Sequence, residues 1–139
     1  MDDVLLQLEQ VKQSYGQRIV IDDLSLVLEE GEIGCLLGSS GCGKTTALRC
    51  IAGFESISAG KIRLNGVCVS SAEIFIPPEQ RQIGMVFQDY ALFPHLDVAK
   101  NIGFGLHRLS RSERERRVEE LLSVVQLMNV SKQYPHELS

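Results

Sequence analysis

The chain has 139 residues, 44% of them hydrophobic and 23% charged, values that are typical of a single globular domain and unlike those of a disordered chain. The net charge of −4 argues against a general nucleic-acid-binding protein, because such a protein needs a basic surface to neutralise phosphates. No apolar run is long enough to cross a bilayer, and the acidic start of the chain lacks the basic region of a signal peptide.

The first thirty residues predict short strands. Residues 5–11 (LLQLEQV) alternate between apolar and polar side chains, and residues 19–30 (IVIDDLSLVLEE) contain two further apolar stretches. Each of these two stretches ends in a pair of acids, at 22–23 and at 29–30, as the end of a metal-binding strand also can. Because both pairs lie close together and precede the glycine-rich stretch described below, we interpret them as polar turns of a hairpin.

The middle of the chain predicts a strand, a helix and a hairpin. Residues 33–37 (IGCLL) are continuously apolar, which predicts a strand covered on both faces in a parallel sheet. Residues 44–54 predict a helix that Gly53 ends, since glycine tolerates the positive φ that often follows a helix. Residues 60–70 predict a hairpin that turns at Asn65-Gly66.

The remainder predicts one more buried strand and then helices. An irregular link at Pro77-Pro78 precedes residues 83–87 (IGMVF), a second continuous apolar run. From Asp97 onward the pattern is helical, with apolar residues at i, i+3, i+4 and i+7: Val118, Leu121, Leu122 and Val125. This order is typical of an α/β protein, although two buried parallel strands need neighbours that this stretch of sequence does not predict.

The last predicted helix carries many charges. Ser112 and Glu115 predict a capping box at its start, and Glu113 and Arg117 have the spacing of an ion pair. Arginine and glutamate alternate along residues 108–120, which favours a solvated helix face over a nucleic-acid-binding patch.

The stretch GSSGCGKTT (38–46) fits the phosphate-binding pattern G-x-x-x-x-G-K-[ST], between a predicted strand and a predicted helix. Its glycines allow successive backbone N–H groups to turn towards an anion, and the helix that follows adds the positive end of its dipole. Lys44 is expected to reach the β- and γ-phosphates, Thr45 to bind Mg²⁺, and Thr46 to donate a further hydrogen bond. The predicted nucleotide-binding residues of this loop are Gly38, Ser39, Ser40, Gly41, Cys42, Gly43, Lys44, Thr45 and Thr46.

The cysteines do not indicate a metal or disulfide framework. Cys35, Cys42, Cys50 and Cys68 include no CxxC pair, so we expect the reduced thiols of a cytosolic protein, with Cys42 as a filler inside the loop.

Two residues outside the loop complete the predicted site. Tyr15 precedes the loop in the sequence and is followed by glycine, so its ring could stack on adenine, or could simply pack at a strand end. Gln88 directly follows the second buried run, at the edge of the predicted sheet where ligands of open α/β sheets bind. There it could meet Mg²⁺ or the attacking water.

Together, Tyr15, residues 38–46 and Gln88 resemble the A-loop, P-loop and Q-loop of the ATP-binding subunit of an ABC transporter, and Leu138-Ser139 resemble the start of the LSGGQ signature. The resemblance covers the whole chain. It implies an α/β P-loop NTPase fold with an N-terminal antiparallel β subdomain, the start of a helical subdomain and an incomplete core sheet. It implies a boundary after residue 88, with residues 1–88 reaching from the β subdomain through the Q-loop and residues 89–139 beginning the helical subdomain.

The same resemblance implies ATP and Mg²⁺ as cofactors, with Thr45 and Gln88 as metal ligands. In that family two ATPase subunits close head to tail and drive transmembrane permease subunits, which work with a periplasmic binding protein. The subunit is then expected at the cytoplasmic face of the inner membrane, contacting the permease through residues 90–96. The resemblance places no catalytic residue in this chain, so the 139 residues alone are expected to be inactive.

The cargo is a finer expectation. Residues 34–55 look most like ferric-iron importers, and Ser39 stands where importers of sugars, polyamines and sulfate commonly carry proline. Those other importers remain the alternative. Two other classes also stay open: a nucleotide-binding fragment that does not hydrolyse ATP, and an ATPase of DNA repair or chromosome organisation. The compact segment after Gln88 argues against the last class.

Overall fold

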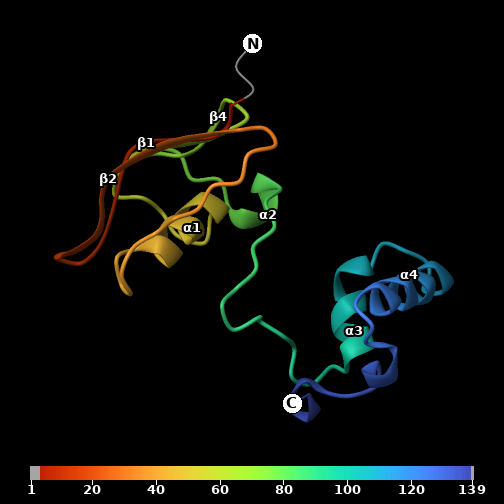
Figure 1. The fold of residues 1–139 in the computed structure, drawn as a ribbon. Coiled ribbons are helices and arrows are strands. Elements are labelled where there is room, and N and C mark those ends of the chain that lie inside the picture. Colours follow the sequence, from red (N-terminus) through yellow and green to blue (C-terminus); the bar gives the residue numbers. More distant parts are fainter. Residues whose placement is uncertain (1–3, 139) are drawn as a thin grey trace. The chain divides into compact units, whose positions relative to one another are not determined.

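The computed structural model describes residues 4–138, which form two compact units. The first unit ends at Met85 and the second begins at Val86 (Figure 1). The two units differ in kind, since the first is built on a sheet and the second on helices. In the described residues, no helix is both long enough and apolar enough to span a membrane.

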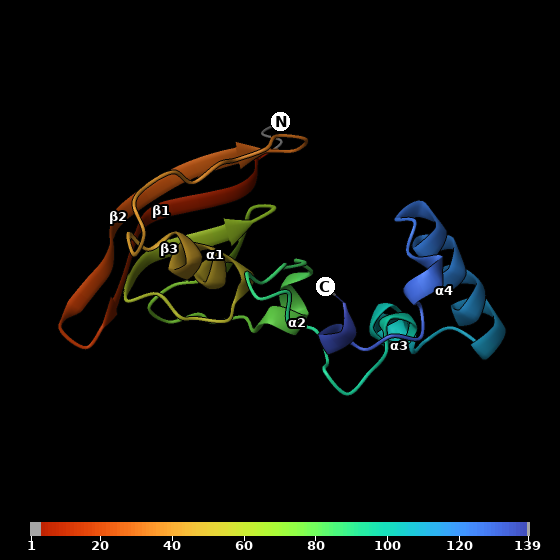
Figure 2. The same cartoon turned by 60° about the horizontal axis from the view of Figure 1, so that its bottom comes forward.

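A four-stranded antiparallel sheet with the strand order β2-β1-β3-β4 organises the first unit. Its strands are β1 (Val4–Tyr15), β2 (Arg18–Glu29), β3 (Ala59–Leu64) and β4 (Val67–Ser70). Helix α1 (Lys44–Ala52) lies against one face of this sheet, and the short helix α2 (Pro78–Arg81) follows β4 (Figures 1 and 2). The antiparallel β part of the predicted fold is therefore confirmed.

The core of the first unit lies between α1 and the sheet. It consists of buried residues from both elements and from the segment that joins α1 to β3: Leu8, Val11, Ile21, Ala47, Cys50, Ile57, Ile62 and Val69. The helix contributes only small side chains to this cluster, which allows its backbone to approach the strands closely. Burial raises the pKa of the Cys50 thiol to about 11, so this thiol stays protonated at neutral pH.

Two of the predicted local signals are confirmed. Helix α1 ends at Ala52, and Gly53 follows in the left-handed region with a φ of 88°. The β3–β4 hairpin turns at Asn65 and Gly66, whose φ angles of 48° and 76° are those of a type I′ turn.

The predicted division of residues 19–30 into two strands is wrong. Residues 18–29 form the single strand β2, which pairs with β1 along its length. Asp22 and Asp23 do not turn the chain. They lie where the pairing register shifts by one residue, and Asp23 has a φ of 58°. Because β1 pairs with β2 on both sides of the acidic pair, the backbone of β2 stays extended there. The two acids are therefore accommodated as a β-bulge.

The two predicted buried strands are also not present as strands. Residues 33–37 and 83–87 have no regular secondary structure, and Ile33, Leu37 and Val86 are 97%, 87% and 88% exposed. A strand of a parallel sheet needs hydrogen-bonded neighbours at its edges and helices over its faces. Among the described residues, neither segment is paired in the sheet.

Arg81 is the main polar group inside the first unit and is only 6% exposed. Its guanidinium donates to four backbone carbonyls: Nε to Ile76 at 2.6 Å, Nη1 to Cys50 at 2.7 Å and Ile51 at 2.9 Å, and Nη2 to Val69 at 3.1 Å. These carbonyls belong to the end of α1, to β4 and to the segment after β4. One side chain therefore joins three segments of the unit.

The surroundings of Arg81 are shaped to accept it. A Cβ atom on Gly53 would lie 2.5 Å from Nε of Arg81, so the glycine that ends α1 also leaves room for the guanidinium. The guanidinium carbon also lies 5.4 Å from the centre of the Phe75 ring. Burial lowers the pKa of Arg81, but an arginine remains charged at any physiological pH.

The second unit is helical and contains α3 (Val98–Gly103), η1 (Phe104–Leu106), α4 (Arg111–Val124), η2 (Met128–Val130) and η3 (Pro135–Glu137). Helix α4 buries Val118 and Leu122, and a Cβ on the buried Gly103 of α3 would contact Val118 at 3.4 Å. The chain after η2 returns to the start of α3, where its carbonyls accept hydrogen bonds from Val98 and Ala99.

The start of α4 differs from the prediction by two residues. Ser110, not Ser112, is the N-cap, and its side chain and that of Glu113 form the capping box. The sequence contains both S-x-x-E patterns, and the helix uses the earlier one, which adds two residues to its length. The predicted Glu113–Arg117 pair is not formed. The Glu113 carboxylate accepts from the Ser110 backbone N–H in the capping box, and Arg117 pairs with Glu120 at 3.0 Å.

We predict that Arg81→Lys destabilises the chain by about 2–3 kcal/mol, because a compact ammonium cannot serve four carbonyls on three segments and leaves buried acceptors unpaired. Urea unfolding followed by circular dichroism measures the change. The matched control is Arg63→Lys, whose surface pair with Glu9 at 3.0 Å should make the change cost about 0.5 kcal/mol or less. Equal losses in the two variants would contradict the role given to Arg81.

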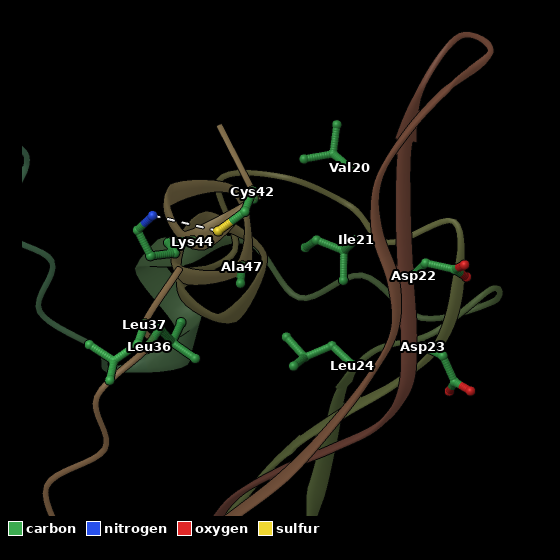
Figure 3. A pocket seen from close by; sticks show the side chains of 11 residues that line it. Val20, Ile21, Asp22, Asp23, Leu24, Leu36, Leu37, Cys42, Lys44 and Ala47 are labelled. Carbon is green, nitrogen blue, oxygen red and sulfur yellow. Dashed lines mark hydrogen bonds between the residues drawn. The ribbon is translucent and has the colours of Figure 1, made fainter. Parts of the chain in front are cut away.

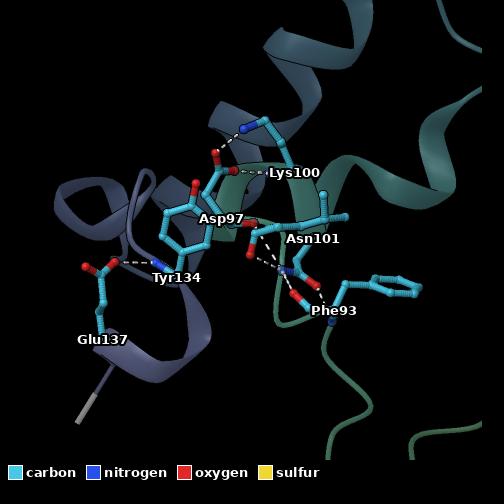
Figure 4. Close-up of polar contacts among 7 residues, drawn as sticks. Phe93, Asp97, Lys100, Asn101, Tyr134 and Glu137 are labelled. Atoms are coloured by element: carbon cyan, nitrogen blue, oxygen red, sulfur yellow. Dashed lines mark hydrogen bonds and ion pairs between the residues drawn. The ribbon is translucent and has the colours of Figure 1, made fainter.

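Asp97 gives a pH-dependent prediction. Its carboxylate accepts from the Lys100 backbone N–H at 2.8 Å and from the Lys100 ammonium at 2.7 Å, which lowers the pKa of Asp97 (Figure 4). Asp97 is the N-cap residue of α3. We therefore expect Asp97→Ala to cost about 1 kcal/mol of unfolding free energy at pH 7, as loss of an N-cap does.

The sign of the pH effect follows from the lowered pKa. The contribution of Asp97 is present above the ordinary carboxyl pKa of about 4 and disappears as the pH falls through the lower folded value. The difference between the wild type and Asp97→Ala, measured by urea unfolding, should therefore shrink below about pH 4. Asp89→Ala, which removes an exposed carboxylate of the same unit, is the control; a pH-independent difference for Asp97→Ala would exclude the carboxylate as its cause.

Candidate functional site

The glycine-rich loop leads directly into helix α1, whose first turn carries Lys44, Thr45 and Thr46. Gly43 is the N-cap residue, with a φ of 94°. A Cβ there would lie 2.6 Å from the carbonyl oxygen of Val20 in β2, so only glycine fits between the loop and the strand. The close contact fixes the start of α1 against β2.

The Lys44 side chain folds back over the loop that precedes it. Its Nζ donates to the carbonyls of Gly38 at 2.8 Å and Ser39 at 2.7 Å, and lies 3.5 Å from Sγ of Cys42 (Figure 3). The ammonium is therefore held at the mouth of the loop by neutral acceptors. Anionic phosphate oxygens are stronger acceptors than neutral carbonyls, so the cation is poised to meet them.

The beginning of α1 is suited to an anion. Gly43 has no side chain to cap the helix, and the first turn, Lys44 to Thr46, contains no acidic side chain. The unpaired N–H groups of a helix start and its positive dipole end are then available to a ligand. Thr45 is exposed and Thr46 half-buried in this turn.

A cavity of about 250 Å³ lies between β2 and the loop. Its lining is mainly aliphatic: Val20, Ile21, Asp22, Asp23, Leu24, Leu36, Leu37, Cys42, Gly43, Lys44 and Ala47. In Figure 3 Val20, Ile21 and Leu24 point from the strand towards α1, whereas Asp22 and Asp23 point away from it. An apolar cavity does not suit phosphates, so we place the candidate anion site at the loop and the helix start.

Tyr15 lies at the end of β1 and is 49% exposed. Its hydroxyl donates a hydrogen bond to the Glu55 carboxylate, and this bond raises the pKa of Tyr15. Glu55 also accepts a hydrogen bond from Arg49 of α1 at 3.3 Å, so the structure joins Tyr15 to the helix that begins at the loop.

Gln88 belongs to the second unit, where it is exposed in a turn. Its predicted contact with Mg²⁺ or water stays a prediction, as does the boundary predicted after residue 88. In the described residues, no cluster of three or more histidine, cysteine or acidic side chains is placed to hold a metal ion.

The segment 90–96, predicted to contact a permease, is held on α3 by one side chain. Asn101 accepts from the Phe93 N–H at 2.9 Å and donates to the carbonyls of Phe93 at 3.1 Å and Leu96 at 2.9 Å (Figure 4). Tyr90 and Ala91 have φ angles of 59° and 48°, and Tyr90 is 75% exposed. Both angles lie in the left-handed region, which costs free energy for residues other than glycine. Such strained backbone is common at functional sites.

Sequence reasoning missed the residues that support this site. Glu55, Arg81 and Asn101 form hydrogen bonds with residues distant in the sequence or on other segments. No local sequence pattern predicts these bonds. The one available signal is that Arg81 is a charged residue three positions after the Pro77-Pro78 pair and two positions before the apolar run 83–87.

Comparisons with known proteins give the family to which the chain belongs. The family described as ABC transporter matches residues 21–139. The putrescine transport ATP-binding protein PotG of Escherichia coli is 47% identical over 137 residues, which are 97% of this chain and 35% of that protein. The Fe(3+) ions import ATP-binding protein FbpC 2 of Pectobacterium atrosepticum is 46% identical over 136 residues, 97% of this chain and 39% of that protein.

The fold comparison gives the same result. A dimeric structure of the ATP-binding cassette MJ0796 in a post-hydrolysis state, bound to ADP and Pi, superposes with a TM-score of 0.83 at 26% identity, covering 97% of this chain and 63% of that one. The chain thus spans little more than a third of the length of these curated relatives. The matched family model, the relatives and the superposed structure show that the chain belongs to the ABC transporter family and has the fold of its ATPase domain.

Proposed function

We propose that the chain binds ATP with Mg²⁺ through residues 38–46. The observation that carries this proposal is the position of Lys44, whose ammonium is held over the loop by the carbonyls of Gly38 and Ser39. The uncapped start of α1 beside it supplies backbone donors. The MJ0796 relative, bound to ADP and Pi, supports a nucleotide as the ligand.

The other predicted residues have chemistry that fits this ligand. A threonine hydroxyl and an amide oxygen are ligands that Mg²⁺ accepts, so Thr45 and Gln88 would hold the metal beside the phosphates. Bound Mg²⁺ would neutralise phosphate charge. Tyr15, at the end of β1 and joined to α1 through Glu55, would stack on the adenine.

In the subunit to which this sequence belongs, we propose that ATP hydrolysis drives solute import. Two such subunits would close head to tail, and permease subunits would contact residues 90–96 at the cytoplasmic face of the inner membrane, with a periplasmic binding protein delivering the solute. The names of PotG and FbpC 2 support transport, and the dimeric MJ0796 structure supports pairing of the ATPase.

The cargo is the finest part of the proposal. Ferric iron is proposed from the resemblance of residues 34–55, and the name of FbpC 2 supports it. A polyamine is the second candidate, because PotG is 47% identical and FbpC 2 46%, so identity does not separate the two. Uptake of labelled putrescine and of labelled Fe³⁺ by a strain that lacks the gene distinguishes them.

We predict that Lys44→Ala weakens Mg-ATP binding at least about tenfold, because it removes a charge-assisted hydrogen bond to phosphate. Isothermal titration calorimetry measures the affinity, and circular dichroism checks that the variant folds. Lys61→Ala, which removes an exposed lysine of β3, is the matched control and should leave the affinity unchanged. An unchanged affinity in Lys44→Ala would show that the loop assignment is wrong.

We also predict that the purified 139-residue chain binds ATP without turning it over. Near the loop, Asp22 and Asp23 point away from it, and Glu55 is engaged by Tyr15 and Arg49, so none of these carboxylates serves as a general base. Phosphate release, followed with Mg-ATP, should equal that of the Lys44→Ala variant. Release that is faster in the wild type, and that depends on Mg²⁺, would contradict this prediction.

A further inference from the structure

We propose that Glu55 is a positioning residue that holds the Tyr15 ring beside the phosphate-binding helix, so that the ring offers a fixed surface to the base of the bound nucleotide. The inference rests on the proposed function and deepens it. It assigns a role in base recognition to a residue that lies outside the loop and that no local sequence pattern singles out.

The first step of the argument is how firmly Glu55 itself is held. Its side chain is only 17% exposed, and its two carboxylate oxygens have different partners. Oε1 accepts from Nη1 of Arg49 at 3.3 Å, and Oε2 accepts from the Tyr15 hydroxyl. The Glu55 backbone N–H also donates to the Arg49 carbonyl at 3.4 Å. Both the backbone and the side chain of Glu55 are thus tied to α1.

The second step is what this arrangement does to Tyr15. Arg49 and Thr46 belong to the same helix that begins with Lys44, and Tyr15 ends β1 on the sheet. The chain of contacts from Arg49 through Glu55 to the Tyr15 hydroxyl therefore sets the distance between the ring and the start of α1. A nucleotide needs such a fixed distance, since its base and its phosphates are joined covalently.

The third step is that the ring remains available. Tyr15 is 49% exposed although its hydroxyl is bonded to Glu55, so the polar end is satisfied by the protein while ring surface stays open to a ligand. An aromatic ring that is already oriented loses less freedom when it stacks on a base. Without Glu55 the ring would have to be ordered by the nucleotide itself.

The test compares Mg-ATP with inorganic tripolyphosphate, which carries the phosphates without a base. We expect Glu55→Ala and Tyr15→Phe each to weaken Mg-ATP binding about fivefold, the equivalent of one hydrogen bond, and to leave tripolyphosphate binding unchanged. The double variant should be no weaker than either single one, because both remove the same bond. Glu55→Gln keeps an acceptor for the hydroxyl and should retain the wild-type affinity within about twofold.

Glu9→Ala, which removes a partly exposed carboxylate paired with Arg63, is the matched control and should change neither affinity. If Glu55→Ala does not fold, Tyr15→Phe and Glu55→Gln carry the same comparison. Equal loss of both ligands, no loss of either, or additive losses in the double variant would overturn the positioning role and leave ATP binding in place. A wild-type chain that binds neither ligand would instead overturn the proposed function, and the inference with it.

Discussion

The packing of α1 on the antiparallel sheet is the constraint on which the rest of the molecule depends. Ala47 and Cys50 are small enough to bring the helix backbone onto the strands, and Gly43 lets its first turn meet β2 without a side chain between them. At the other end, the carbonyls of Cys50 and Ile51 are fixed by Arg81. The helix is thus held at both ends, and its start, which faces the candidate ligand, cannot shift without disturbing the core.

The loop proposed to bind ATP and the segment proposed to contact a permease lie in different parts of the sequence. The loop and Tyr15, which are proposed to bind the nucleotide itself, belong to the first unit. Gln88, a proposed Mg²⁺ ligand, and the segment proposed to contact a permease belong to the second unit, where Asn101 fixes that segment. In the proposed function, the loop binds ATP and does not contact a transported solute. Relatives named for putrescine and for Fe³⁺ can therefore resemble this chain to the same degree.

Local signals were enough for some elements and not for others. Helix α1 and the β3–β4 hairpin could be predicted because Gly53 and Asn65-Gly66 act within their own turns. The continuity of β2 could not, since β1 holds its backbone extended through the acidic pair. Residues 33–37 look like a buried strand because they are apolar, yet an apolar run becomes a strand only beside partners. At the site, the loop was readable from its spacing, whereas Glu55 acts through contacts that only the fold creates.

The return of the chain to the start of α3 has a consequence for how the second unit opens. The amides of Val98 and Ala99 donate to the carbonyls of Gln133 and Ser131, each at 2.9 Å, so residues more than thirty positions apart are joined through the main chain. Helix α4 lies within the closed loop, and its apolar face packs on α3. The amide hydrogens of Val98 and Ala99 can exchange with solvent only when these two hydrogen bonds break. We therefore expect α3 and α4 to open together as one cooperative unit.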